Sequence, residues 1–187
     1  MKQSVRIIGI WILCWTLFFS NGVAQTKATV SAIGVGIQQS YVGVAIGLWH
    51  GIGLSVNGER ILKDLPEFNG LIGAGGEIGY AADKDEWKYW GEHYGWKYTY
   101  IPIFGFASFH YRLTNPKIDP YVRLGLGYVY VNSKAFGTYT GYWGEASSSY
   151  VGINGQVGVR YFVSPNLCAR AALGTPWLLS VGADFKF

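Results

Sequence analysis

Apolar residues alternate with small or polar residues along most of this chain, and this period of two constrains its fold more than any other feature. Between Tyr150 and Val163, Val, Ile and Tyr occupy most odd-numbered positions, with Gly, Asn, Gln and Arg between them. Successive side chains of a β-strand point to opposite faces, so the pattern predicts a strand with one apolar face. It recurs in seven other segments, at about residues 33–37, 42–48, 72–80, 101–111, 121–130, 167–173 and 177–187.

The composition indicates that the apolar faces of these strands contact lipid. Charged residues make up 14% of the chain, against about 25% in soluble domains, and aromatic residues make up 17%. Beyond the first 24 residues no apolar run approaches the roughly 20 residues of a transmembrane helix. An even number of strands, each with one apolar face, is typical of membrane barrels. We therefore predict an all-β fold, an eight-stranded antiparallel up-and-down transmembrane β-barrel.

The first residues have the pattern of an export signal. Two basic residues precede an apolar run from Ile7 to Phe19, and the small residues of Gly22-Val23-Ala24 follow. The run is too short to span a bilayer, which favours a cleavable signal peptide over a membrane anchor. We predict a signal peptide at residues 1–24 and one outer-membrane β-barrel domain at residues 25–187.

The connections between the predicted strands alternate in length. Thr114–Lys117 and Ser164–Asn166 have turn compositions, whereas about Ala82–Gly95 and Ser133–Ser149 are long, polar and aromatic. In outer-membrane barrels the short turns face the periplasm and the long loops face outward. Val56–Phe68 is expected to be a short periplasmic turn, but it is long and charged. Its sequence fits either an extended hairpin or a short helix.

The last eight residues form a pattern of their own. A polar residue is followed by glycine two positions on, and aromatic residues take the third-last and last positions; these residues are Ser180, Gly182, Phe185 and Phe187. The pattern resembles the β-signal by which the barrel assembly machinery reads the final strand of outer-membrane proteins. Further segments strengthen the likeness, namely Tyr98–Ile103, Phe109–Tyr111, Asp119–Tyr121 and Leu124–Tyr128.

Together these segments resemble the small outer-membrane β-barrel domain family, which includes OmpX and the membrane domain of OmpA. The resemblance implies a location in the outer membrane of a Gram-negative bacterium, reached through the periplasm. It also implies three partners: outer-membrane lipid, lipopolysaccharide and, during biogenesis, the barrel assembly machinery. It does not imply one activity, because members of the group serve as adhesins, envelope tethers and defence proteins.

Several charged residues occupy positions that should face the barrel interior: Glu77, Arg112, Arg123, Arg160, Arg170, Asp184 and Lys186. Eight strands leave an interior just wide enough for side chains. We therefore predict a mutually satisfied charge network that fills the lumen, in preference to a conduction path. The single cysteine outside the signal segment, Cys168, should also point inward, where we interpret it as a packing residue.

The sequence does not favour a catalytic, metal or cofactor site. A lipid A-modifying barrel enzyme, which stays a remote alternative, would use a His–Ser pair with a carboxylate near the outer rim. His110 should lie near the periplasmic end, and His93 alone is suitably placed, with Glu92 and Asp85 nearby. Two adjacent residues do not make a metal ligand set. We predict a non-enzymatic protein without cofactors.

The predicted loop from Asp83 to Trp96 carries five aromatic residues among charged ones. Some belong to the aromatic girdle at headgroup depth, but exposed rings interleaved with charge are typical of contact surfaces. We predict extracellular contacts through Trp87, Trp90 and Tyr94, and hence surface recognition, adhesion or envelope contact with an extracellular or polysaccharide ligand. The alternative is an envelope-stability barrel or narrow channel without external ligand.

Nucleic acid is not a predicted partner. The chain has 15 basic and 11 acidic residues, and two of the basic ones, Lys2 and Arg6, lie in the signal segment. The remaining excess of positive charge is small, and it is scattered along the sequence. Nucleic-acid-binding domains instead gather basic residues on one face.

Overall fold

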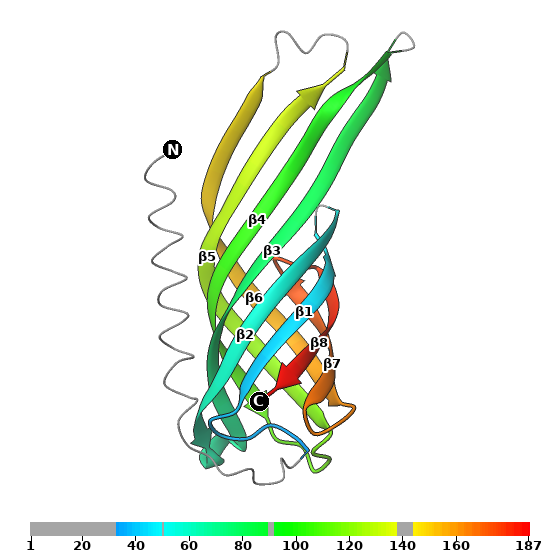
Figure 1. Cartoon of the computed structure of the whole chain (residues 1–187). Helices are drawn as coiled ribbons and strands as arrows, with labels where there is room; N and C mark the ends of the chain where they lie inside the picture. The colour runs from blue at the N-terminus through cyan, green and yellow to red at the C-terminus, as the bar shows by residue number, and fades with distance from the viewer. Residues whose placement is uncertain (1–32, 50, 90–91, 138–143) are drawn as a thin grey trace. The chain divides into compact units, whose positions relative to one another are not determined.

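The computed structural model describes residues 33–49, 51–89, 92–137 and 144–187, which form eight antiparallel strands in a closed barrel (Figure 1). The strands are β1 (Ser40–Leu48), β2 (Ile52–Leu65), β3 (Gly70–Tyr89), β4 (Glu92–Tyr111), β5 (Ile118–Phe136), β6 (Glu145–Phe162), β7 (Leu167–Thr175) and β8 (Leu179–Lys186). Each strand pairs with the next, and β8 pairs with β1. The predicted fold class is confirmed. The predicted signal peptide lies outside the described residues.

Within the described part of the chain, no helix is long and apolar enough to cross a membrane. The one helical element there is a short 3₁₀ turn, η1 (Pro66–Phe68), between β2 and β3. Asn69 follows it in the left-handed conformation, with φ of 48°, and its backbone N–H donates to the carbonyl of Pro66. This tight turn lets β3 start directly beside β2.

One of the eight predicted strands was misplaced. Residues 33–37 are not a strand, because Gly34 (φ 112°) and Gln38 (φ 63°) turn the backbone out of the extended conformation. The missing strand is β2, which contains most of the segment Val56–Phe68 predicted to be a connection. Its charged side chains obscured the alternation, and a register shift between Ile61 and Lys63 interrupts it further.

The strands have unequal lengths, so one half of the barrel wall is taller than the other (Figure 1). The pairing of β2 with β3 stops at Ala82, and that of β6 with β7 begins at Gly155. Beyond these points β3 to β6 continue alone as a four-stranded sheet, which we call the raised sheet (residues 83–89, 92–100, 131–136 and 145–150). The predicted long loops at 82–95 and 133–149 are therefore mostly strand.

The outward side of the barrel is apolar. Leu124, Leu126, Val151 and Ile153 are each at least 62% exposed, and most other large exposed side chains are Val, Ile, Leu or Tyr. Exposing so much apolar surface to water costs about 25 cal/mol per Å², whereas a bilayer accepts it without cost. The outward belt therefore fits a barrel that spans a membrane.

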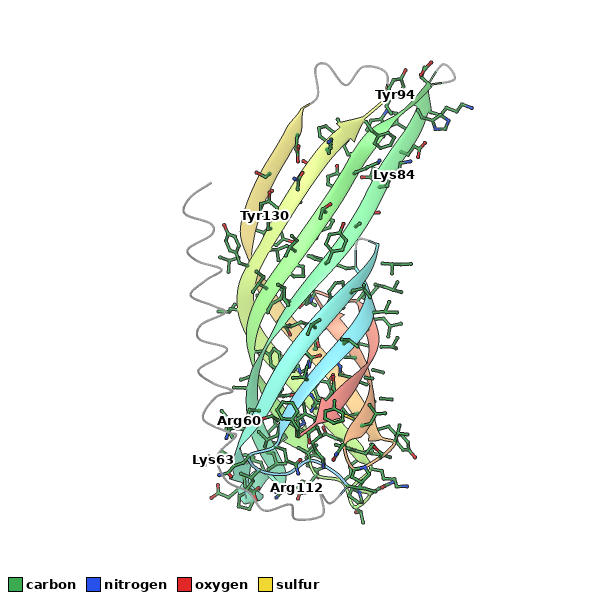
Figure 2. All side chains as sticks on the ribbon, viewed as in Figure 1. Arg60, Lys63, Lys84, Tyr94, Arg112 and Tyr130 are labelled. Atoms are coloured by element: carbon green, nitrogen blue, oxygen red, sulfur yellow. The ribbon has the colours of Figure 1, made fainter. Side chains whose placement is uncertain are left out.

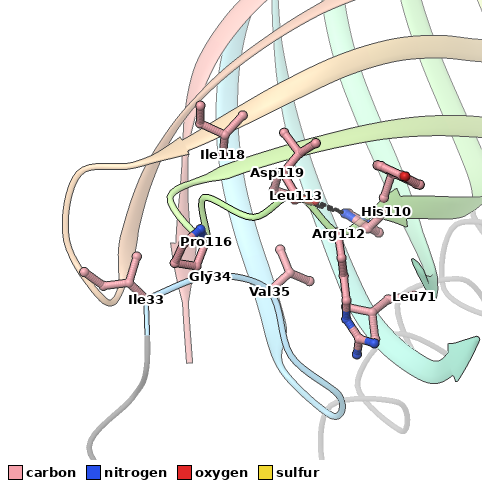
Figure 3. A pocket seen from close by; sticks show the side chains of 11 residues that line it. Ile33, Gly34, Val35, Leu71, His110, Arg112, Leu113, Pro116, Ile118 and Asp119 are labelled. Carbon is pink, nitrogen blue, oxygen red and sulfur yellow. Dashed lines mark hydrogen bonds and ion pairs between the residues drawn. The ribbon is translucent and has the colours of Figure 1, made fainter. Parts of the chain in front are cut away.

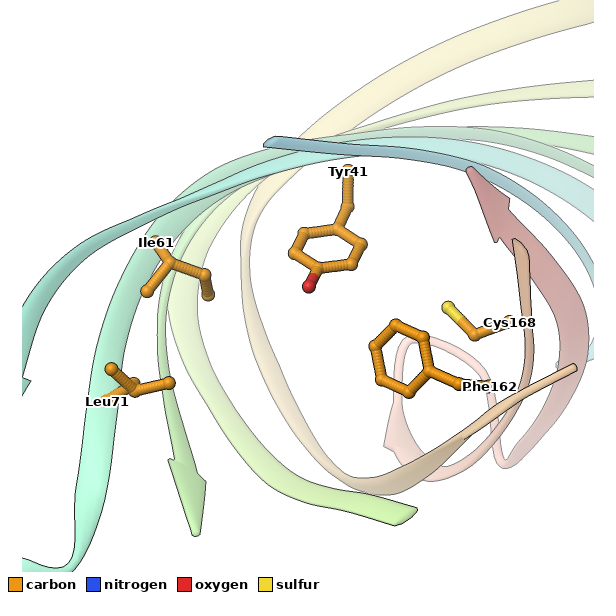
Figure 4. Close-up of a cluster of buried hydrophobic side chains, with 5 residues drawn as sticks. All are labelled: Tyr41, Ile61, Leu71, Phe162 and Cys168. Atoms are coloured by element: carbon orange, nitrogen blue, oxygen red, sulfur yellow. The ribbon is translucent and has the colours of Figure 1, made fainter. Parts of the chain in front are cut away.

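The end of the barrel where β8 stops, which we call the terminal end, is closed by residues 33–39. Val35 packs against a buried cluster of five side chains, Tyr41, Ile61, Leu71, Phe162 and Cys168 (Figure 4). Two hydrogen bonds hold the segment in place: the backbone N–H of Gln38 donates to the carbonyl of Ile61 at 3.0 Å, and Lys186 Nζ donates to the carbonyl of Gly34 at 3.1 Å. Cys168 is buried, as expected of a packing residue.

Candidate functional site: the filled lumen and the raised sheet

Glu59, on β2, is the centre of the lumen network. Its Oε2 accepts hydrogen bonds from Arg123 Nη2 at 3.0 Å and from Arg160. Its Oε1 accepts from Ser108 and lies 3.0 Å from Nε2 of His110. One carboxylate thus joins β2 to β4, β5 and β6 across the barrel. The sequence did not reveal Glu59 as an inward residue, because its segment was predicted to be a connection.

Two aspartates extend the network. Asp119 lies 3.0 Å from Nδ1 of His110, and Asp184 accepts from Arg160 Nε at 2.7 Å and lies 3.3 Å from Arg170 Nε. Among the described residues, the buried carboxylates equal the buried Arg and Lys side chains in number: Glu59, Glu77, Asp119 and Asp184 against Arg123, Arg160, Arg170 and Lys186. Such close charge balance is what a dry, side-chain-filled interior requires.

Ser108, His110 and Asp119 have the spacing of a catalytic triad, with 3.2 Å from Ser108 Oγ to His110 Nε2. Ser108 stands two positions before His110, so both face inward, a pairing that the sequence reasoning overlooked. Glu59, however, faces both the Ser108 hydroxyl and Nε2. A ring nitrogen that donates to Glu59 cannot accept the proton of Ser108. The buried group thus forms one hydrogen-bond network with Glu59.

Arg112 does not lie in the lumen, contrary to prediction. Strand β4 ends at Tyr111, and the inward–outward alternation ends with it. The Arg112 side chain is 39% exposed at the terminal end, where Nη1 lies 2.8 Å from Asp64 Oδ1. The structure places the other predicted lumen residues inside, although Glu77 lies apart from the arginines.

Trp177, predicted to face lipid, is buried in the lumen with 1% exposure. It belongs to the connection between β7 and β8, so the alternation of β8 does not orient it. Its Nε1 donates to Glu77 Oε1 at 2.5 Å. The indole lies against Gly47, Gly53 and Gly79, where an added Cβ would approach the ring to 2.6 Å or less. Three neighbouring strands, β1, β2 and β3, thus leave room for one ring. This ring narrows the lumen at the end opposite to the terminal end.

A small hollow of about 170 Å³ opens at the terminal end (Figure 3). Val35, Leu71 and Pro116 line it, with His110 and Asp119 at its inner side. Ligand pockets commonly measure about 300–1,000 Å³. The hollow is therefore too small to indicate a site for a sizeable ligand.

The inner face of the raised sheet continues the lumen-facing side of the barrel and is aromatic and acidic. The register pairs Asp83 with Tyr98, Asp85 with Trp96, and Trp87 with Tyr94. The alternation of the four strands also brings Glu92, Tyr100 and Tyr150 to this face. Among the described residues this face carries no Lys or Arg, and Trp87 is half exposed. Trp90 lies outside the described residues.

Aromatic contacts connect the lumen to this face. Ring centroids lie 6.1 Å apart for Trp177 and Trp49, 5.1 Å for Trp49 and Tyr100, and 6.3 Å for Tyr100 and Tyr98. Each separation is within the range of favourable ring contacts. The inner face is therefore supported by a column of packed aromatic rings that starts at Trp177 in the lumen.

His93 lies on the opposite, outer face of the raised sheet, where it contacts Glu86. Hydrogen bonds from Lys84 and from His93 hold the pKa of the Glu86 carboxyl below its usual value. Asp85, which the sequence puts near His93 as a carboxylate partner, points to the inner face. The structure therefore does not assemble His93 and Asp85 into one site.

No protein-family model and no curated protein sequence matches the chain. Two solved structures share its fold. The N-terminal β-barrel domain of Pseudomonas aeruginosa OprF is 14% identical, with a TM-score of 0.51 over 82% of this chain and 100% of that one. A major outer membrane protein from Thermus thermophilus is 12% identical, with a TM-score of 0.54 over 80% and 99%. The chain thus has the fold of small outer-membrane β-barrels, and its apolar belt agrees with that location.

Proposed function

We propose that this chain is a non-enzymatic outer-membrane barrel that recognises a surface ligand, most simply a polysaccharide, on the inner face of the raised sheet. The observation that carries the proposal is the gathering of Trp87, Tyr94 and Trp96 with Asp83 and Asp85 on one face above a filled lumen. Binding sites commonly combine apolar and aromatic walls with a few placed polar groups. Rings offer flat surfaces to sugar rings, and carboxylates accept hydrogen bonds from sugar hydroxyls.

The aromatic girdle does not account for these rings. Girdle residues sit on the outward face at headgroup depth, the position that we expect for the exposed outward rings of Tyr80, Tyr128 and Tyr130. The rings of Trp87 and Tyr94 belong to the inner face, which faces away from lipid. An exposed aromatic surface in that position favours a partner that covers it.

A barrel that stabilises the envelope without an external ligand is the second candidate. The filled lumen favours it over a channel: the charge network occupies the middle, Trp177 narrows one side, and Val35 closes the terminal end. This candidate leaves the aromatic inner face without a role. The two candidates therefore differ in what that face does.

The test removes the rings. The triple substitution Trp87→Ala, Trp90→Ala and Tyr94→Ala should lower binding to cells or to surface polysaccharide more than tenfold, which corresponds to about 1.4 kcal/mol. The heat-dependent gel shift should persist, because Trp87 and Tyr94 belong to the raised sheet, beyond the closed part of the barrel. A matched girdle triple, Tyr80→Ala, Tyr128→Ala and Tyr130→Ala, should lower the unfolding temperature and leave binding intact. A ring triple that binds like the parent but unfolds earlier would assign those rings to folding.

A further inference from the structure

Three lysines stand directly side by side on the outer face of the raised sheet. Lys84 of β3 is opposite Lys97 of β4, and Lys97 is opposite Lys134 of β5. Neighbouring strands lie about 4.8 Å apart, and like charges directly opposite each other destabilise a sheet. The ammonium groups of the row therefore repel one another unless neighbouring groups offset their charge.

The protein offsets only part of it. Lys84 forms an ion pair with Glu86, and the ring of Phe136 lies 4.6 Å from Lys84 Nζ and 5.4 Å from Lys97 Nζ. Gly95 makes this possible, because a Cβ there would lie 2.8 Å from the Phe136 ring. The shared ring holds two ammonium groups close together on one face.

Among the described residues, the acid at the end of the row forms no ion pair with it. Glu145 stands opposite Lys134, but its Oε1 accepts a hydrogen bond from Asn132 Nδ2 at 2.7 Å. Among the described residues, neither Lys97 nor Lys134 forms an ion pair, and both side chains are exposed. The row thus presents positive charge outward, toward the surroundings of the barrel.

The register also gives the height of the row. Strands β3 and β5 both run from the terminal end toward the raised sheet. Lys84 follows Tyr80 on β3 by four residues, and Lys134 follows Tyr130 on β5 by four residues, so each lysine lies on the same outward face as its girdle tyrosine and above it. Four residues at about 3.4 Å each, in strands tilted by about 40°, rise about 10 Å. Because girdle tyrosines lie at headgroup depth, we expect the lysines to lie at the outer edge of the polar layer of the membrane.

We propose that Lys84, Lys97 and Lys134 form a binding site for the phosphate groups of an outer-leaflet lipid, carried in this membrane by lipopolysaccharide. Lysine binds phosphate as a point charge, and basic residues near a membrane surface are attracted to anionic lipid. A phosphate between neighbouring ammonium groups would replace their repulsion with two attractions. The site lies on the opposite face from the proposed ligand surface, so each can fail without the other.

The test compares lipopolysaccharide with its dephosphorylated form. The probe is the midpoint temperature of the heat-dependent gel shift in dodecyl maltoside micelles, with or without either lipid. Lipopolysaccharide should raise the midpoint of the parent by about 5 °C, since a ligand of the folded state stabilises it. In Lys97→Gln/Lys134→Gln the rise should be less than half as large. Without lipid this variant should be at least as stable as the parent, because the repulsion is relieved.

The control is Lys63→Gln/Lys117→Gln, which removes the same charge from exposed lysines at the terminal end. It should keep the full rise, as should the triple variant Trp87→Ala/Trp90→Ala/Tyr94→Ala. An equal loss in the control would show general charge attraction and overturn the site. So would an undiminished rise in Lys97→Gln/Lys134→Gln, or an equal rise with dephosphorylated lipid.

Discussion

Glu59 illustrates how much one residue can contribute inside a barrel of this size. Its substitution by Ala would leave Arg123 and Arg160, both fully buried, without the carboxylate between them. Removing one partner of a buried ion pair costs about 3–5 kcal/mol, so the denaturant midpoint of Glu59→Ala should fall sharply.

The matched control is Asp64→Ala, because Asp64 pairs with Arg112 at a partly exposed site. Exposed pairs contribute about 0–1 kcal/mol, and the midpoint should move little. Equal effects of the two substitutions on urea unfolding in micelles would mean that water reaches the lumen and screens its charges.

At the scale of single residues, the alternation located most inward charges but could not show where a strand ends. Arg160 and Asp184 were assigned to the correct face from their position in long regular strands. Arg112 was assigned wrongly because β4 stops one residue earlier. Trp177 was assigned wrongly because it belongs to a connection, where its orientation depends on the glycines that make room for it.

Among the elements, β8 carries the predicted assembly signal. The backbone of Phe187, just beyond it, exchanges hydrogen bonds with Ser40, at 3.0 and 3.1 Å. The Phe187→Ser substitution should lower the folded yield in cells, because we expect the barrel assembly machinery to read the terminal aromatic. Refolding from urea into micelles should change little, since one exposed ring contributes modestly. A normal yield in the outer-membrane fraction would show that the aromatic ending is coincidental.

The elements also show why strand number was easier to predict than strand position. The even count arose from the wrong segment, residues 33–37, in place of β2. In the raised sheet, the pairing of Lys84 with Lys97 and of Asp83 with Tyr98 puts polar residues on both faces. Where neither face of a strand contacts the hydrocarbon core, apolar and polar residues no longer alternate, although the backbone hydrogen bonds between the strands continue. Strands that extend beyond a membrane therefore resemble loops in the sequence.

For the whole molecule, the orientation of its surfaces leads to one prediction. A soluble eight-stranded barrel such as a lipocalin puts its apolar face inside, whereas here the inside is charged and the outside apolar. The protein in micelles should migrate differently on a gel before and after boiling, and it should fractionate with the outer membrane. A soluble periplasmic pool without the gel shift would contradict the membrane assignment.

A second whole-molecule prediction concerns conduction. In a planar bilayer the parent should show little or no steady conductance, because paired side chains leave no continuous water column. Trp177→Ala should stay closed as well, because the charge network and Val35 still fill the lumen between this ring and the terminal end. Large, stable, ion-selective openings in the parent would support the channel hypothesis.

Because the wall is unequal in height, the barrel has a tall side and a low side when it is viewed along the membrane normal. The inner face of the raised sheet is backed by β3 to β6 and open above the shorter strands β1, β2, β7 and β8 (Figure 2). Access to it therefore runs sideways, over the low rim. Crowding by a neighbouring protein on the low side would shield this face, whereas crowding on the tall side would leave it open. In a packed membrane, the rotation of each barrel about the membrane normal would decide whether its ligand surface can be reached.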